Sequence, residues 1–311
     1  MCPTVFREIW DKEELEPDPA LTAWVMNPGQ RFVIDDGVLD LFPNLDVLVT
    51  PSTGRNHIDL VACERRGIPV YSLHDDRDAL NTISASAEFT FLLLLNALRR
   101  LDIAIQEVTA RRWREREDFM RGRELSAKKV GIVGLGRIGR RMARYCTAFD
   151  ASVVYYDPYV ENEEFHRCSL EELFGQCDIV CICCALTSET TGMISGSLLT
   201  RLKEGACLIN TSRGEVINEQ DLAEVLIRRP DLRVALDVLV DEVTNAHLTS
   251  PLLAMHDRGQ IVITPHIAGA TVESQEKAAR IALRLLTRHL AVDFCSPYPA
   301  STPPATRSLR S

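Results

Sequence analysis

The sequence contains no apolar run long enough to cross a membrane. Its longest such stretch, residues 89–95, ends at Asn96, whereas a membrane-spanning helix needs about 20 apolar residues. The N-terminus also lacks the basic segment followed by an apolar one that a secretory leader has. We therefore expect a cytoplasmic protein that does not bind membranes.

An excess of positive charge is also missing. The chain of 311 residues has a formal net charge of −9, which argues against a basic groove for nucleic acid and against attraction to anionic lipid. Its 46% apolar and 25% charged residues are ordinary for a globular protein. At this length the chain can form two domains, each with its own core.

The ten cysteines do not form a recognisable metal site. Cys181, Cys183 and Cys184 lie together in an apolar run that is typical of a strand covered on both faces. In such a strand Cys181 and Cys183 point to the same side. No second Cys or His cluster supplies further ligands at zinc spacing. We expect reduced, structural thiols and no metal; a metal site at this cluster is the alternative.

Residues 130–139 have the pattern of a buried strand, a glycine turn and the start of a helix. Gly134 permits a tight turn, Gly136 lets the backbone approach a pyrophosphate, and Gly139 lets helix and strand pack closely. The first N–H groups of the helix would bind that pyrophosphate, because the helix dipole favours negative charge there. Together these features predict dinucleotide binding.

Asp157 ends a second apolar run 18 residues after Gly139. A carboxylate at this position accepts hydrogen bonds from a ribose diol and repels a 2′-phosphate. The residues that follow Asp157 offer no arginine to hold such a phosphate. The sequence therefore favours NAD over NADP.

From residue 128 to about 255, strand-like runs alternate with helix-like segments, which predicts a parallel sheet with crossover helices. Ser169 and Asn218 are the expected N-caps of two of these helices. The order fits a doubly wound, Rossmann-type cofactor domain. The expected strands are 130–133, 153–156, 179–184, 206–210, 234–237 and 261–264.

The first ~100 residues repeat the alternation on a smaller scale, which predicts a second α/β domain. Gly67 is expected to end a helix that begins near His57. Strands are expected at 4–9, 22–26, 45–50 and 69–72, and long helices at 79–100, 101–119 and 271–291.

Domain limits follow from this alternation. We expect a substrate-binding domain of residues 1–98 and 290–311, and an NAD-binding domain of residues 99–289. The tail from Pro297 is expected to be disordered. Trp113 is expected to be the buried anchor of a solvated helix face at 111–116.

Charged residues follow three of the later strands. Arg213 comes just after the strand at 206–210, Asp237 ends the next strand and is soon followed by Glu242, and His266 comes after the last. Because open α/β sheets bind ligands at the carboxyl ends of their strands, we expect these side chains to converge. The alternative for Asp237 is that it caps a turn.

An arginine, a histidine and a carboxylate suit the reduction of a 2-oxo acid and the reverse oxidation. Arg213 can hold a carboxylate through two hydrogen bonds and polarise the adjacent carbonyl. A histidine such as His266 titrates near neutrality and can exchange a proton with the substrate oxygen. Glu242 beside it would favour the imidazolium and orient the ring, and the cofactor would supply the hydride.

These motifs resemble those of the D-isomer-specific 2-hydroxyacid dehydrogenase family, most closely its 3-phosphoglycerate-dehydrogenase-like members. The resemblance covers about residues 45–290 and is carried by segments 134–139, 210–214, 235–237 and 265–269. It implies a Rossmann domain beside a smaller, flavodoxin-like substrate domain. It also implies Arg213, Glu242 and His266 as catalytic residues, NAD as cofactor, a small anionic 2-hydroxy or 2-oxo acid as substrate, and a homodimer formed through region 101–119 and the cofactor domain.

Together, the glycine turn and the resemblance assign residues to each ligand, with Asp237 expected to contact the nicotinamide amide. The alternative for Arg77 is an ion pair with a neighbouring aspartate. The cofactor-binding set is Thr53, Gly134, Gly136, Arg137, Ile138, Gly139, Asp157, Cys184, Ala185, Leu186, Thr211, Ser212, Arg213, Asp237, His266, Ala268 and Gly269. The substrate-binding set is Asn27, Ser52, Thr53, Gly54 and Arg77.

The chain departs from the family pattern in places. Cys184-Ala185 replaces the usual Thr-Pro near the adenosine-side phosphate, and the segment from Glu242 to His266 is longer than usual. The first domain diverges more, so the substrate's identity does not carry over. Two further hypotheses stay open, namely oxidation of another small anion such as phosphite, and a non-enzymatic NAD-sensing corepressor.

Overall fold

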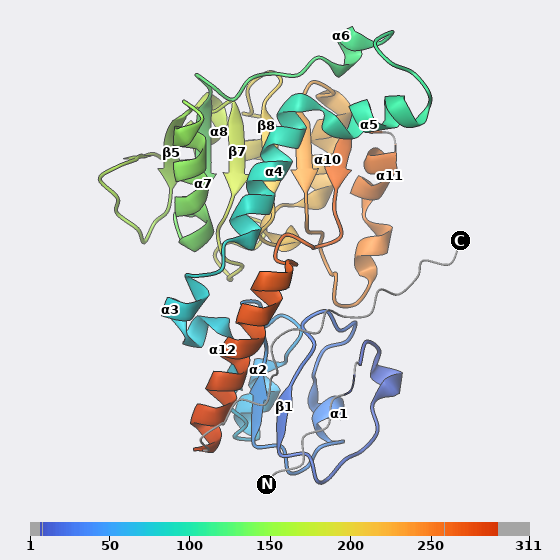
Figure 1. The fold of residues 1–311 in the computed structure, drawn as a ribbon, viewed down its shortest axis with the longest axis vertical. Coiled ribbons are helices and arrows are strands. Elements are labelled where there is room, and N and C mark those ends of the chain that lie inside the picture. The colour runs from blue at the N-terminus through green and yellow to red at the C-terminus, as the bar shows by residue number, and fades with distance from the viewer. Residues whose placement is uncertain (1–6, 8, 258, 292–311) are drawn as a thin grey trace.

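The computed structural model describes residues 7, 9–257 and 259–291, which form two parallel sheets flanked by helices (Figure 1). The larger sheet consists of β4 (Lys129–Val133), β5 (Ser152–Tyr156), β6 (His166–Arg167), β7 (Ile179–Ile182), β8 (Cys207–Asn210), β9 (Arg233–Leu236) and β10 (Ile261–Ile263). Its strand order is β10-β9-β8-β7-β4-β5-β6, and every neighbouring pair is parallel. The smaller sheet pairs β1 (Ala23–Val25), β2 (Val47–Val49) and β3 (Val70–Tyr71) in that order.

This arrangement confirms the predicted doubly wound fold. Chain order reverses between β4 and β7, which places the ligand crevice of such a sheet beside the glycine turn. All six predicted strands of the large sheet form, although β7 ends two residues before the predicted Cys184. The seventh strand, β6, was not predicted, because its two exposed residues carry no apolar pattern.

Side chains alternate across β7 and fill two cores. Ile179 and Cys181 belong to the core under α4 (Ala85–Arg99) and α7 (Arg137–Ala148), whereas Val180 and Ile182 belong to the core on the opposite face. That second core is covered by α8 (Leu170–Gln176), α9 (Gly196–Leu199), α10 (Glu219–Arg228) and α11 (Pro251–Asp257). Burial on both faces explains the continuous apolar runs in the sequence.

The cysteine cluster follows the same alternation. As predicted, Cys181 and Cys183 face the same side, toward the core under α4 and α7. Cys184 packs on the opposite core. Burial raises the pKa of the Cys184 thiol to about 11. The described cysteines are unpaired thiols, and no group of three or more His, Cys, Asp or Glu among the described residues is placed to hold a metal ion.

Both predicted helix caps are confirmed. The Ser169 side chain accepts from the Glu172 N–H at 3.2 Å, and Glu172 bonds back to the Ser169 N–H, which forms a capping box. The Asn218 side chain accepts from the Asp221 N–H at 3.1 Å and begins α10.

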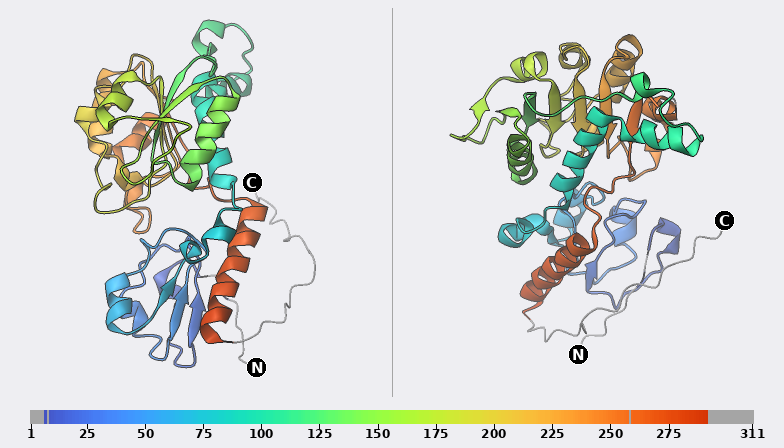
Figure 2. Two further views of the ribbon diagram at one scale, coloured as in Figure 1. Left: turned by 90° about the vertical axis from the view of Figure 1, so that its left-hand side faces the viewer. Right: turned by 45° about the horizontal axis from the view of Figure 1, so that its top comes forward.

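The small sheet is covered on one face by α1 (Asp36–Leu39) and α2 (Leu60–Arg65). Its other face packs against α12 (Val272–Leu290), which returns from the large domain (Figure 2). Most of the predicted strand at 4–9 and all of the tail from Pro297 lie outside the described residues. Within the described residues there are also four short 3-10 helices: η1 (Lys12–Glu14), η2 (Leu73–Asp75), η3 (Gly214–Val216) and η4 (Ala246–Thr249).

Two predicted long helices are each split. Asp76 caps a separate helix α3 (Arg77–Leu80) ahead of α4. At the predicted boundary after residue 100, Arg100 adopts a left-handed backbone at φ 52° and separates α4 from α5 (Leu101–Thr109). A loop then divides the second predicted helix into α5 and α6 (Glu117–Met120). The prediction for Trp113 is wrong, because residues 111–116 lie in that loop and the indole is 72% exposed.

The domains meet where α3 leads into α4 and where β10 leads into α12. Packing places α4 on the large sheet and α12 on the small one, which favours boundaries near 81–84 and 264–271, earlier than the predicted 98/99 and 289/290. At the first junction the carbonyls of residues 81–83 accept hydrogen bonds from Arg141, Lys277 and Arg137 at 2.6, 2.9 and 2.6 Å. None of the described helices is long and apolar enough to span a bilayer.

Candidate active site

The glycine turn joins β4 to α7 at the point where the strand order reverses. Gly134 has φ +91°, and a Cβ there would lie 2.7 Å from the backbone of Cys184. A Cβ on Gly139 would lie 2.0 Å from the Gly134 carbonyl oxygen. A Cβ on Gly136 would meet nothing within 4 Å. The chain's own packing thus requires two of the glycines, while the third leaves open space that suits a bound pyrophosphate.

Asp157, at the end of β5, orders this turn. Its carboxylate accepts from the Leu135 N–H at 2.8 Å and from the Tyr159 N–H at 2.9 Å. The next helix starts at Arg137 and no side chain caps it within the described part of the chain, so its first N–H groups can bind an anion. These observations fit a dinucleotide cofactor. The predicted contact of Asp157 with a ribose remains a prediction.

Glu242 and His266 form a hydrogen-bonded pair at the carboxyl ends of β9 and β10, between Glu242 Oε2 and His266 Nδ1. Burial raises the pKa of the Glu242 carboxyl, but the hydrogen bond and charge of His266, with the Leu239 N–H and Arg213, outweigh it and hold that pKa below its usual value. Glu242 therefore stays ionised beside the imidazole. Its hydrogen bond to Nδ1 fixes the orientation of the ring.

His266 has a left-handed backbone, with φ 52°. Such a conformation is costly for a residue with a side chain and persists where the surroundings enforce it. Its N–H donates to the Asp237 carbonyl at 2.8 Å. The backbone is thus fixed to the residue that follows β9, and the ring is hydrogen-bonded to Glu242.

Asp237 supports the same loop with its carboxylate, which is fully buried. It accepts from Thr264 Oγ1 at 2.5 Å, from the Ile267 N–H at 3.0 Å and from the Ala268 N–H at 2.8 Å. Burial raises the pKa of Asp237 in spite of these bonds. Asp237 therefore caps the turn that carries His266; a contact with nicotinamide stays a prediction.

Arg213 follows β8 and lies within the electrostatic reach of Glu242. Burial lowers the pKa of its guanidinium, and the charges of Glu242 and Glu215 partly offset that effect. Its Nη1 donates to the Ser212 carbonyl at 2.6 Å. The three predicted catalytic residues thus come together at one edge of the large sheet.

The long segment between Glu242 and His266 folds into η4 and α11 without displacing the pair. Glu219 anchors the chain on both sides of Glu242. Its Oε1 accepts from the Val240 N–H at 2.7 Å, and its Oε2 accepts from Ser250 Oγ within the segment at 2.5 Å. Glu242 and His266 therefore pair across this segment.

The first domain approaches Arg213 through the turn after β2. A Cβ built on Gly54 would lie 2.2 Å from Arg213 Nη2, so the guanidinium rests directly on this glycine. Ser52 Oγ donates to the Gly54 carbonyl at 2.7 Å, and Thr50 Oγ1 lies 3.0 Å from Ser52 Oγ. The structure thus brings the turn that contains the predicted residues Ser52, Thr53 and Gly54 next to Arg213.

His57 also belongs to this site, and sequence reasoning missed it. It is 3% exposed, and its Nε2 lies 3.2 Å from Thr50 Oγ1. Burial and the charge of Arg213 lower its pKa to about 4. Only its place three residues after Gly54 could have drawn attention to it.

The remaining predicted residues occupy nearby loops. Thr211 Oγ1 lies 2.6 Å from Thr90 Oγ1 of α4, a second contact that the sequence did not suggest. Asn27 accepts from the Gly29 N–H at 2.9 Å and shapes the turn after β1. Arg77 forms no ion pair within the described residues, while Asp76 pairs with Arg284. The other residues predicted to bind the cofactor follow strands β4, β7, β8 and β10 in the chain, and their contact with the cofactor stays a prediction. They are Ile138, Cys184, Ala185, Leu186, Ser212, Ala268 and Gly269.

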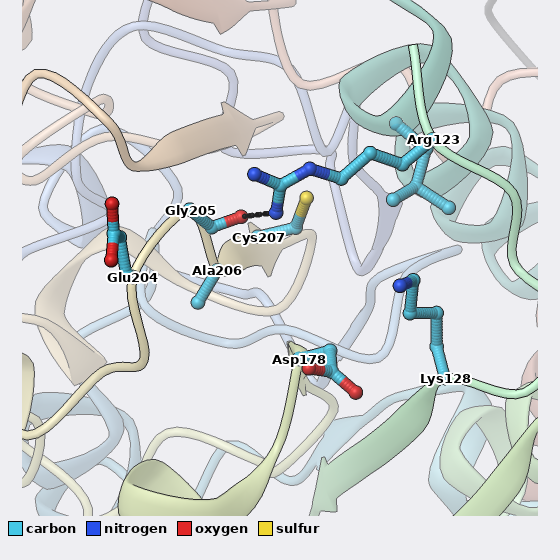
Figure 3. A pocket seen from close by; sticks show the side chains of 8 residues that line it. Arg123, Lys128, Asp178, Glu204, Gly205, Ala206 and Cys207 are labelled. Atoms are coloured by element: carbon cyan, nitrogen blue, oxygen red, sulfur yellow. Dashed lines mark hydrogen bonds between the residues drawn. The ribbon is translucent and has the colours of Figure 1, made fainter.

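A small cavity lies at the opposite, amino-terminal edge of the large sheet (Figure 3). It has room for about one water molecule and is lined by Arg123, Lys128, Asp178 and Cys207 among others. Arg123 closes one side by donating to the Gly205 carbonyl at 2.8 Å. Its size and position separate it from the candidate active site.

Comparison with known proteins agrees with this geometry. Residues 91–268 match the family described as "D-isomer specific 2-hydroxyacid dehydrogenase, NAD binding domain". A glyoxylate reductase of Thermofilum pendens is 35% identical over 263 residues, which cover 81% of this chain and 74% of the relative. A D-3-phosphoglycerate dehydrogenase of Mycobacterium bovis is 31% identical over 266 residues, 84% of this chain but 48% of that longer protein.

The fold is also similar to that of a solved D-lactate dehydrogenase from Aquifex aeolicus, complexed with NAD and lactic acid. The two superpose with a TM-score of 0.77 at 26% identity, over 90% of this chain and 87% of the other. The likeness extends over both domains and includes the first, where the sequence motifs are weakest.

Proposed function

The chain belongs to the D-isomer specific 2-hydroxyacid dehydrogenase family, and we propose that it interconverts a small 2-oxo acid and the corresponding D-2-hydroxy acid with NAD(H). The observation that carries this proposal is the hydrogen bond between His266 and Glu242 at one edge of the sheet. The charge of Arg213 acts on Glu242 at the same edge. That arrangement combines a proton donor with a carboxylate clamp, the two groups that carbonyl reduction needs from a protein.

The proposed roles follow from these contacts. Arg213 holds the substrate carboxylate and polarises the neighbouring carbonyl. His266 gives its proton to the carbonyl oxygen during reduction and takes it from the hydroxyl during oxidation, while Glu242 stabilises the charged ring. When bound, the nicotinamide cofactor supplies or accepts the hydride. Residues 134–139, with Asp157, would hold the cofactor, and the carboxylate at Asp157 favours NAD.

Arg77 is our proposed contact for a second anionic group on the substrate. It is exposed and has no ion-pair partner in the described residues. Burial lowers the pKa of His74 most. The charges of Arg137, Arg55 and Arg77 lower it further, while that of Asp75 raises it. Several positive side chains therefore lie near one another beside the domain junction, and this setting suits an acid with a second negative charge.

The reaction is tested by following NADH oxidation with glyoxylate, pyruvate, hydroxypyruvate, 3-phosphohydroxypyruvate and 2-oxoglutarate. We expect turnover with at least one of these acids, a preference for NADH over NADPH, and loss of activity in His266→Asn. Phosphite with NAD is assayed in parallel. Turnover of phosphite alone would replace the proposal with oxidation of an inorganic anion. Tight NADH binding without turnover of any acid would favour the corepressor hypothesis.

We further propose a homodimer formed through region 101–119 and a cytoplasmic location. Support for the dimer comes from large apolar side chains on α5 and the following loop, where Ile105 is 58% and Trp113 72% exposed. Light scattering should give twice the chain mass for the wild type and a shift toward monomer for the double variant Ile105→Asp, Trp113→Ser. A wild-type monomer at micromolar concentration would refute the dimer.

A further inference from the structure

A chain of three polar side chains connects the interior of the first domain to the turn that touches Arg213. His57 Nε2 lies 3.2 Å from Thr50 Oγ1, which in turn lies 3.0 Å from Ser52 Oγ. Ser52 Oγ lies 2.7 Å from the carbonyl oxygen of Gly54. Thr50 is fully buried and His57 nearly so, so water does not compete for these bonds.

The hydrogen-bond directions in this chain follow from its last acceptor. A carbonyl oxygen cannot donate, so the Ser52 hydroxyl must give its one proton to Gly54. The Thr50 hydroxyl must then donate to Ser52, which leaves Thr50 Oγ1 as the acceptor for His57. His57 therefore carries a proton on Nε2 and acts as the donor that starts the chain.

The chain ends against the proposed carboxylate clamp. A Cβ on Gly54 would lie 2.2 Å from Nη2 and 3.3 Å from Cζ of Arg213. The other guanidinium nitrogen, Nη1, is held by the Ser212 carbonyl. The turn at 52–54 therefore fixes one side of the guanidinium, and a displacement of the turn changes where Arg213 can meet a carboxylate.

We propose that His57 is a positioning residue for substrate binding: through Thr50 and Ser52, its Nε2 proton fixes the turn at 52–54 against Arg213 and so sets the affinity for the substrate's carboxylate. This inference rests on the proposed function, because it takes Arg213 as the carboxylate clamp. His57 itself does not touch the substrate in this account.

The surroundings keep the imidazole in the form that this role needs. Arg213 is the charged group whose field acts on His57, and burial together with that like charge lowers the pKa of the ring to about 4. At neutral pH the ring is neutral, with a single N–H that the directions above place on Nε2. A neutral donor also adds no charge that would compete with Arg213 for the substrate anion.

The test compares two substitutions at His57. His57→Phe keeps a ring of similar size and removes the donor, whereas His57→Gln keeps an N–H near the position of Nε2. We expect His57→Phe to raise KM for the 2-oxo acid about tenfold, as the loss of one buried hydrogen bond implies, while kcat changes less than twofold and the Kd of NADH stays unchanged. His57→Gln should recover most of the lost affinity. An unchanged KM in His57→Phe, or an equal loss in both variants, overturns the proposal.

A double-mutant cycle places the effect in the chain. Thr50→Val removes the middle hydroxyl and should raise KM to a similar extent. If His57→Phe does not fold, Thr50→Val is used in its place to test the chain. If both residues act through one chain, the double variant raises KM about as much as either single variant. A KM increase in the double variant equal to the product of the two single increases would show that His57 and Thr50 act independently, and would overturn the proposal. Thr147→Val is the matched control, because its hydroxyl donates to Ala143 within α7, away from the turn.

Binding of oxamate, a carboxylate that resembles a 2-oxo acid, separates this inference from the reaction itself. Calorimetry with the NADH complex should show about tenfold weaker oxamate binding to His57→Phe, whether or not the wild type turns over any tested acid. Equal affinity for wild type and variant overturns the positioning role while leaving the proposed function standing. Wild-type protein that neither binds oxamate nor reduces any acid contradicts both.

Discussion

Two regions of the molecule meet at the guanidinium of Arg213: the carboxyl edge of the large sheet and the turn at 52–54 of the first domain. They differ in how their side chains are placed to act there. On the large sheet, each functional side chain follows directly after its strand, as Arg213 follows β8 and His266 follows β10. In the first domain, the effect of His57 passes through two hydroxyls before it reaches Arg213. The first region carries groups suited to the chemistry, and the second fixes the geometry in which those groups meet the substrate.

The largest effect is expected from a substitution at the carboxyl edge of the large sheet, the region with groups suited to the chemistry. Replacing the imidazole in His266→Asn removes the group that exchanges the proton, so kcat should fall by about 10²–10⁴, the usual contribution of general acid–base catalysis. The Kd of NADH and the thermal midpoint should stay near wild type, because the ring is on the surface of the site. Steady-state kinetics with the best acid check this; near-wild-type kcat would remove His266 from the mechanism.

The next effect concerns the boundary between the two regions. Gly54→Ala places a methyl group 2.2 Å from Arg213 Nη2, so the guanidinium must move and kcat/KM should fall by about 10²-fold, as small misplacements of a substrate-positioning group do. NADH affinity should remain. Gly175→Ala in α8 is the matched control, since its Cβ meets nothing within 4 Å. Equal activity of the two variants would show that the turn does not set the position of Arg213.

Within the large domain, substitutions in the glycine turn can separate a loss of NADH affinity from a loss of stability. Gly136→Ala adds a methyl group into open space at an ordinary φ of −77°, so the fold should keep its stability while NADH binds at least about tenfold more weakly. Gly139→Ala places its methyl group 2.0 Å from the Gly134 carbonyl and should lower both stability and affinity. Thermal unfolding with fluorescence titration of NADH checks both. Unchanged NADH affinity in Gly136→Ala would contradict the assigned pyrophosphate site.

The smallest effect is a pH dependence that belongs to the first domain. The pKa of His57 is about 4 in the folded chain against 6.5 for an ordinary histidine, so below pH 6.5 the unfolded chain binds more protons than the folded one. Its contribution to stability is complete above pH 6.5 and is lost as the pH falls toward 4. Between pH 7 and 4.5 the wild type should lose about 2 kcal/mol more free energy of unfolding than His57→Gln. Parallel denaturant curves at both pH values, with equal losses, would show that His57 is not held neutral.

The sequence predicted the large sheet well because local signals and long-range packing agree there. The apolar run at β7 is buried on both faces. Glu242 forms a hydrogen bond with His266 although a long segment of chain separates them. Prediction failed where a contact depends on distant packing. Trp113 has the composition of a buried anchor, yet the chain leaves the helix before it. The role of His57 depends on how the two domains meet, which no local pattern encodes.

The most direct test of the account measures kcat and KM for one 2-oxo acid in two variants side by side. Glu242→Gln removes the charge that stabilises the imidazolium on the large sheet, and His57→Phe removes the donor that fixes the turn of the first domain. We predict that Glu242→Gln lowers kcat by at least about tenfold with little change in KM, while His57→Phe raises KM with little change in kcat. Changes in the same kinetic parameter in both variants would contradict the division between a catalytic edge and a positioning turn.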